Sequence, residues 1–235
     1  GPPREILDLP KHWQINYNKT MKQSRLDQLA DSIFAIVMTI LVFEIRIPEY
    51  TRVVSDQVLL DSIFSVYPAI LSYIISFFLL FTYWRSHHFI QSILAKNIDT
   101  HFSNLNAVFF LFVGLVPFSS HFLGKYNYSK IAIIVFGINI ILIGISLFFM
   151  RQYVLQSETI ENEHITKTEN EHANMHILFP VIASVLAIII SFFSTKIAII
   201  LFTIAIMFNL LKSSTRYIYY VIDLFRSKQN GEEIL

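Results

Sequence analysis

The residue types that suggest chemistry lie in the first half of the chain, as two carboxylates and a group of histidines. Asp27 and Asp31 stand four residues apart beside a long apolar run, and residues with this spacing share one face of a helix. The histidines and their polar neighbours follow at Trp84, His87, His88, Asp99, His101, Asn104 and Asn106. Imidazoles and carboxylates bind metals, carry protons or form hydrogen bonds with one another.

Two interpretations of this group remain open from the residues. One is a metal or haem site that uses His87, His88 and His101, although two adjacent histidines cannot both point inward from one helix. The other is a structural network, in which the carboxylate of Asp31 accepts a hydrogen bond from the Trp84 indole or from an imidazole, since buried polar groups need partners. We favour the network, and expect neither a metal site nor a cofactor.

The rest of the chain has few features that indicate an enzyme. There are no cysteines, and the chain's six glycines form neither a phosphate-binding nor a dinucleotide-binding fingerprint. His172 and His176 have the spacing of a two-ligand face, but they lie in an acidic segment, 151–176, that we interpret as a solvated linker. We therefore predict that the protein is not an enzyme.

Composition indicates a membrane protein. Apolar residues make up 54% of the 235 residues and charged residues only 15%, which is far from the balance of soluble domains. The net charge of +1 gives no reason to expect a nucleic-acid partner. We therefore expect an all-α polytopic protein in contact with membrane lipids.

Charge-free runs predict six spans in one transmembrane domain, 25–211, between an N-terminal segment, 1–24, and a C-terminal tail, 212–235. The predicted spans are 25–47, 62–84, 102–122, 131–150, 177–195 and 197–211. Six spans place both termini on the same side. That side carries thirteen of the lysines and arginines and the other side five, which predicts that both termini are cytoplasmic in the cell membrane.

The first span is unusual because its charge-free part runs only from Ser32 to Phe43. Ionisable residues in a span face protein or water rather than lipid, so this helix is expected to be central. Around Ile36, one stripe of the helix contains apolar and hydroxyl side chains; it includes Ser32, Thr39, Ile40 and Phe43. Asp27 and Asp31 lie on the opposite side. The stripe indicates either ordinary packing or the lining of a central axis.

Three segments resemble the transmembrane protein 175 family of potassium channels. Arg25 and Asp31 have the spacing of its first-helix signature, with Leu29 and Ala30 where that signature has Phe and Ser. Residues 84–89 resemble its Trp-x-x-His-His motif, and residues 104–119 resemble the pattern of its third helix. The resemblance covers roughly residues 20–122, and the second half is similar only in its number of spans.

The resemblance implies a homotetramer of six-helix subunits whose first helices line a pore for potassium ions, without a carbonyl-lined filter loop. It places the constriction at Ile36, within a lining of Ser32, Ile36, Thr39, Ile40 and Phe43. The structural network would then consist of Arg25, Asp31, Trp84, His87, His88, Asn104 and Asn106. The alternatives are a secondary transporter and a membrane protein with a histidine-based cofactor site.

Overall fold

The computed structural model describes residues 23–95, 98–157, 160 and 167–210, and these residues form helices and connecting segments without a strand. The predicted tail 212–235, nearly all of the predicted segment 1–24 and part of the acidic segment lie outside this part of the chain. The helices are α2 (Gln23–Ile40), η1 (Leu41–Glu44), α3 (Asp56–Ser65), α4 (Tyr67–His88), η2 (Phe89–Leu94), α5 (Thr100–Gly114), α6 (Val116–Lys125), α7 (Lys130–Gln156), α8 (Lys167–Ser191) and α9 (Thr195–Leu210).

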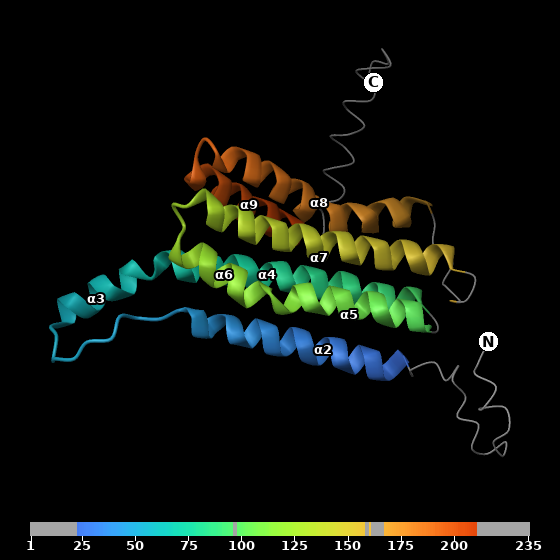
Figure 1. Ribbon diagram of the computed structural model, residues 1–235, viewed down its shortest axis with the longest axis horizontal. Coiled ribbons are helices and arrows are strands. Elements are labelled where there is room, and N and C mark those ends of the chain that lie inside the picture. Colours follow the sequence, from blue (N-terminus) through green and yellow to red (C-terminus); the bar gives the residue numbers. More distant parts are fainter. Residues whose placement is uncertain (1–22, 96–97, 158–159, 161–166, 211–235) are drawn as a thin grey trace, which may run out of the picture.

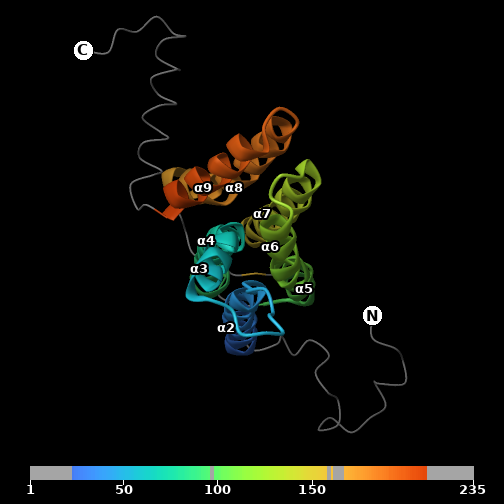
Figure 2. The ribbon, with the colours of Figure 1, turned by 90° about the vertical axis from the view of Figure 1, so that its left-hand side faces the viewer.

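The long helices run side by side along the longest axis of the molecule (Figure 1). α2 lies along one edge, next to α4 and α5, while α7 packs against α8, and α8 against α9, on the other side. The end-on view shows α2 beneath α4 and α5, with α8 and α9 farthest from it (Figure 2). α2 is therefore an edge helix of the bundle, and the described residues leave one of its sides uncovered.

Five helical segments are long and apolar enough to cross a membrane by length and composition. They are Arg25–Glu44, Tyr67–Ser92, Thr100–Lys125, Lys130–Gln156 and Asn174–Ser191. α9 contributes a shorter apolar helix, Thr195–Met207. These segments support the predicted all-α class and a multi-pass membrane protein, with five candidate spans and one shorter helix where six spans were predicted.

The first helix ends before the predicted residue 47. α2 tightens into the 3₁₀ helix η1, and Ile45 is extended, with φ −87° and ψ 96°. Pro48 lies three residues further on and drives Ile47, the residue before it, out of the helical conformation, so the helix cannot continue through the predicted end. Glu44 is the last helical residue of this segment.

Prolines also set two other boundaries. α3 is a separate helix that projects beyond the bundle, and Val66 divides it from α4, which has Pro68 at its first positions (Figure 1). The predicted span 102–122 consists of α5 and α6, divided at Leu115. Pro117 lacks the N–H that would continue the hydrogen-bond ladder of α5, so a new helix begins there.

One face of α2 is buried against the bundle. The buried side chains of α2 recur at helical spacing and continue into the first residue of η1, as Leu26, Ala30, Phe34, Val37 and Leu41. Phe34 is only 2% exposed, and its ring lies 6.0 Å from the ring of Phe109 on α5. This packing fixes the rotation of α2 about its axis and so determines which side chains face outward.

Candidate pore face and polar network

The predicted pore lining lies on the exposed face of α2 and η1, opposite the buried side chains. Ser32, Ile36, Thr39, Ile40 and Phe43 are all exposed in the single chain. Ile36 is 56% exposed and Phe43 is 69% exposed, whereas Phe34 is buried. The face is mostly apolar, with hydroxyls at two levels, and the described part of the chain leaves it uncovered, so it can contact another molecule or line a path.

Both hydroxyls on this face donate hydrogen bonds to the backbone of their own helix. The Ser32 hydroxyl donates to the carbonyl oxygen of Gln28 over 2.7 Å. The Thr39 hydroxyl lies 2.9 Å from the carbonyl oxygens of both Ala35 and Ile36. Because the hydroxyl hydrogen points back along the helix, the oxygen lone pairs remain available on the open side. These oxygens can therefore accept from water or coordinate a cation.

A polar network joins α2 to α4 at the end of the bundle where α2 begins. The indole nitrogen of Trp84 donates a 2.8 Å hydrogen bond to the carboxylate of Asp31. The ring of His88 stacks on Trp84 at a centroid distance of 5.8 Å. The His88 ring nitrogen lies 3.3 Å from the hydroxyl of Ser92, one turn further along. The structure thus brings together three residues of the predicted network.

Asp27 extends this network, although it was not among the residues predicted for it. Its carboxylate accepts a 2.8 Å hydrogen bond from the amide of Gln91 and a 3.0 Å hydrogen bond from Ser92. The sequence does contain a signal for these partners. Gln91 and Ser92 follow Trp84 and His88 at intervals of seven and four residues, which place them on the same side of the helix.

His87 belongs to a separate, buried contact. Its ring nitrogen lies 2.7 Å from the side-chain oxygen of Asn106, and its ring stacks on Phe109 at 5.0 Å. His87 and His88 therefore point to different neighbours, as expected for adjacent residues on one helix. Arg25 and Asn104 are exposed, and no hydrogen bond joins them to either group within the described part of the chain.

The histidines do not form a joint site in this structure. The ring of His101 lies against Tyr153, 4.6 Å between centroids, rather than beside His87 or His88. Among the described residues, no group of three or more His, Asp or Glu side chains is placed to hold a metal ion.

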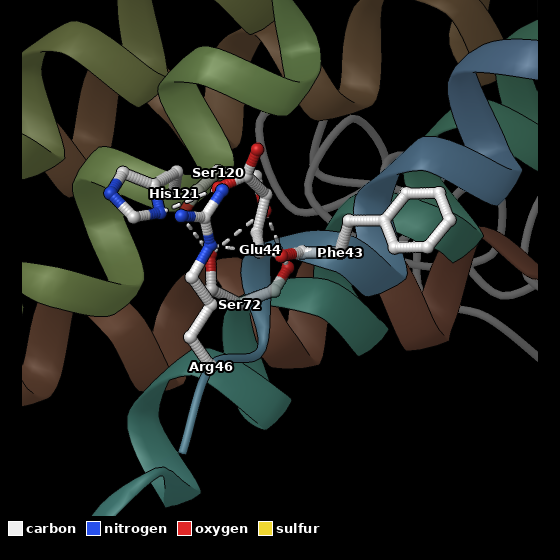
Figure 3. A network of polar contacts seen from close by, with 6 residues as sticks. All are labelled: Phe43, Glu44, Arg46, Ser72, Ser120 and His121. Carbon is white, nitrogen blue, oxygen red and sulfur yellow. Dashed lines mark hydrogen bonds and ion pairs between the residues drawn. The ribbon is translucent and has the colours of Figure 1, made fainter. Parts of the chain in front are cut away.

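At the opposite end of α2, a second polar contact ties η1 to α6. The carboxylate Oε2 of Glu44 lies 2.7 Å from Nδ1 of His121, and Arg46 donates to the carbonyl oxygen of Phe43 (Figure 3). The ring of Phe43 points away from this group. The adjacent residues Phe43 and Glu44 therefore point to different sides of η1: Glu44 contacts α6, and the ring of Phe43 faces away from it. No local sequence pattern points to His121, because its partner is about eighty residues away in the chain.

Comparisons with known proteins agree with the family resemblance of the motifs in the first half of the chain. Residues 25–117 match a family model described as "Endosomal/lysosomal potassium channel TMEM175". A potassium channel from Chryseobacterium sp. (strain P1-3) is 29% identical over 180 residues, which cover 76% of this chain and 88% of that protein. A potassium channel from Chamaesiphon minutus is 33% identical over 102 residues, covering 43% of this chain and 49% of that protein.

The fold is also shared with a solved structure. The crystal structure of a lysosomal potassium-selective channel TMEM175 homolog from Chamaesiphon minutus superposes with a TM-score of 0.67. The match covers 81% of this chain and 97% of that chain, at 23% identity. The structural likeness shows the fold, and with the family and sequence matches it confirms the resemblance that the motifs indicated.

Proposed function

We propose that this chain, a member of the TMEM175 family of potassium channels, is the subunit of a potassium-selective channel whose pore is lined by α2 and η1. One observation carries the proposal. The side chains predicted to line a pore occupy one continuous exposed face of α2 and η1, while the other face is fixed against the bundle. In an assembly, that face is available to surround a central axis.

The proposed assembly is a homotetramer of six-span subunits in the cell membrane, with both termini cytoplasmic. α9 supplies the sixth span, shorter than the others, and Lys196 near its beginning can extend toward the headgroups. The distribution of lysines and arginines supports this orientation. Four copies of α2 would cover one another's exposed apolar side chains around the axis.

The proposed constriction is a ring of four Ile36 side chains. An aliphatic ring can close by losing its water and does not need a charged plug. The exposed Thr39 lies nearly one helical turn from Ile36, toward Glu44, and offers oxygen lone pairs, since its hydrogen is bonded to its own helix. An ion passing Ile36 sheds part of its water, and these oxygens replace some of it.

This pore has no need of a carbonyl-lined filter. α2 is a continuous helix, so its carbonyl oxygens accept hydrogen bonds within the helix and only side chains face outward. The expected selectivity is modest, because few fixed dipoles line the path. Potassium passes more readily than sodium because it holds its water less tightly.

Planar-bilayer recording of the purified protein tests this function. We expect discrete single-channel steps and, with potassium on one side and sodium on the other, a reversal potential that shows preference for potassium. Saturable flux without discrete steps would instead indicate a secondary transporter. Visible absorption bands or stoichiometric bound metal in the same sample would favour the cofactor alternative, and a channel that does not distinguish the two ions would remove the selectivity claim.

A further inference from the structure

A groove of about 620 Å³ lies at the end of the bundle where α3 projects, and the proposed pore does not use it. Its walls come from the beginning of α4, the end of α6 with the residues after it, and the beginning of α9. The groove therefore lies between α4 and α9. α9 is among the helices farthest from α2 in the end-on view (Figure 2).

The lining changes character along the groove. Tyr67 and Thr195 begin α4 and α9, so the groove is polar at this end. Further along the same two helices the lining is mostly aliphatic, with Ile75 on α4 and Ile199 and Ile204 on α9. The two hydroxyls at this level, of Ser72 and Thr203, donate to backbone carbonyl oxygens of the protein. In a membrane-spanning bundle, a tyrosine-flanked end belongs at the headgroup level and an aliphatic wall at the level of the acyl chains.

Two polar groups of the groove lining, on Lys196 and Asn127, can be matched to an occupant. Lys196 is exposed and is the one charged side chain among the described residues that line the groove. The side-chain oxygen of Asn127 is buried and accepts no hydrogen bond from the part of the chain that the structure describes. An occupant that satisfies both groups carries a negative charge and a hydrogen-bond donor at one end, and hydrocarbon at the other.

We propose that this groove binds an anionic glycerophospholipid of the leaflet on this side. Its phosphate pairs with Lys196, a hydroxyl or amine of its headgroup donates to Asn127, and an acyl chain lies against the isoleucines of α9. The positive charge of Lys196 and the change from polar to apolar lining along the groove match the headgroup and acyl chain of a lipid. For this reason we favour a lipid over a second copy of the chain as the occupant. The proposal does not depend on ion conduction, so it stands or falls separately from the channel function.

The test measures the lipid retained by the purified protein. The protein is exchanged into mild detergent with equal amounts of phosphatidylglycerol and phosphatidylcholine, and native mass spectrometry counts the bound molecules. We expect the wild type to prefer phosphatidylglycerol. Lys196→Gln should weaken that binding roughly tenfold, because it removes one charge-assisted contact. Lys130→Gln is the matched control, since Lys130 lies over the ring of Phe192 outside the groove lining.

A second pair of variants tests the apolar part. Thr203→Trp fills the groove and should displace both lipids, whereas Ile197→Trp, on the same helix but outside the lining, should not. Equal retention in Lys196→Gln and Lys130→Gln, or no preference between the lipids, overturns the proposal. Because the chain has no cysteine, Ile200→Cys gives a single thiol, and disulfide-linked dimers through it would show that a second copy fills the groove.

Discussion

The indole nitrogen of Trp84 on α4 donates a 2.8 Å hydrogen bond to the carboxylate of Asp31 on α2. Asp31 lies away from Ile36 on the helix, so this bond holds α2 by its flank while Ile36 stays on the open face. Asp27, one turn earlier, is held in the same way by Gln91 and Ser92. Asp27 and Asp31 therefore bind α2 to the rest of the bundle through hydrogen bonds. The proposed pore is lined by apolar and hydroxyl side chains instead.

Removing the Asp31 carboxylate should weaken the protein without changing its selectivity. Asp31→Ala removes the acceptor of the half-buried Trp84 indole, at a cost of roughly 0.5–1.5 kcal/mol in the free energy of unfolding. Thermal unfolding and size-exclusion chromatography in detergent measure this loss and any loss of assembly. Trp84→Phe should have a similar effect, and the double variant should cost less than the sum of the two. Altered ion selectivity with normal assembly would contradict this role.

Replacing Ile36 by asparagine should raise the current at rest. The amide lets water persist in the proposed constriction, so the barrier from dewetting falls. Open probability and conductance in planar bilayers measure the effect. Ile36→Leu, which keeps an aliphatic ring, is the control and should remain close to the wild type. If a folded, assembled Ile36→Asn protein conducts like the wild type, the constriction lies at another residue.

Substitution of Thr39 should change the ratio of potassium to sodium permeability. Thr39→Val keeps the side-chain shape and removes the oxygen, so a partly dehydrated ion loses a ligand. Thr39→Ser keeps the oxygen and should stay nearer the wild type. Reversal potentials under bi-ionic conditions measure the ratio. The shift in Thr39→Val should exceed that of any variant at Asp31 or His87, and an unchanged ratio would exclude Thr39 from selectivity.

Two glycines provide a matched test of the packing between α4 and α6. A Cβ added at Gly124 would lie 2.9 Å from the Cα of Ala69, so Gly124→Ala must push the two helices apart, at a cost of about 1–3 kcal/mol in stability. A Cβ added at Gly114 meets no atom within 4 Å. Gly114→Ala should therefore be neutral or slightly stabilising, since alanine favours the helix. Equal unfolding temperatures for both variants would show that this close approach does not contribute.

Local rules were sufficient for most of the fold and for the proposed pore face. The long apolar runs predict membrane helices, because a helix satisfies its backbone polar groups within one segment when it lies in lipid. The helical period alone separates the face of Ile36 and Phe43 from that of Asp31, because a side chain's direction on a helix depends only on its position in the sequence. The family motifs are likewise confined to short stretches, and the matched family covers residues 25–117.

The tertiary structure decided which partners these side chains have. The sequence left Asp31 with three possible donors; in the fold it is paired with Trp84, while His87 is buried against Asn106 and His88 stacks on Trp84. The tertiary structure also pairs Asp27 with Gln91 and Glu44 with His121. These choices depend on the rotation and depth at which helices far apart in sequence pack, and packing between whole helices, rather than any local pattern, determines both.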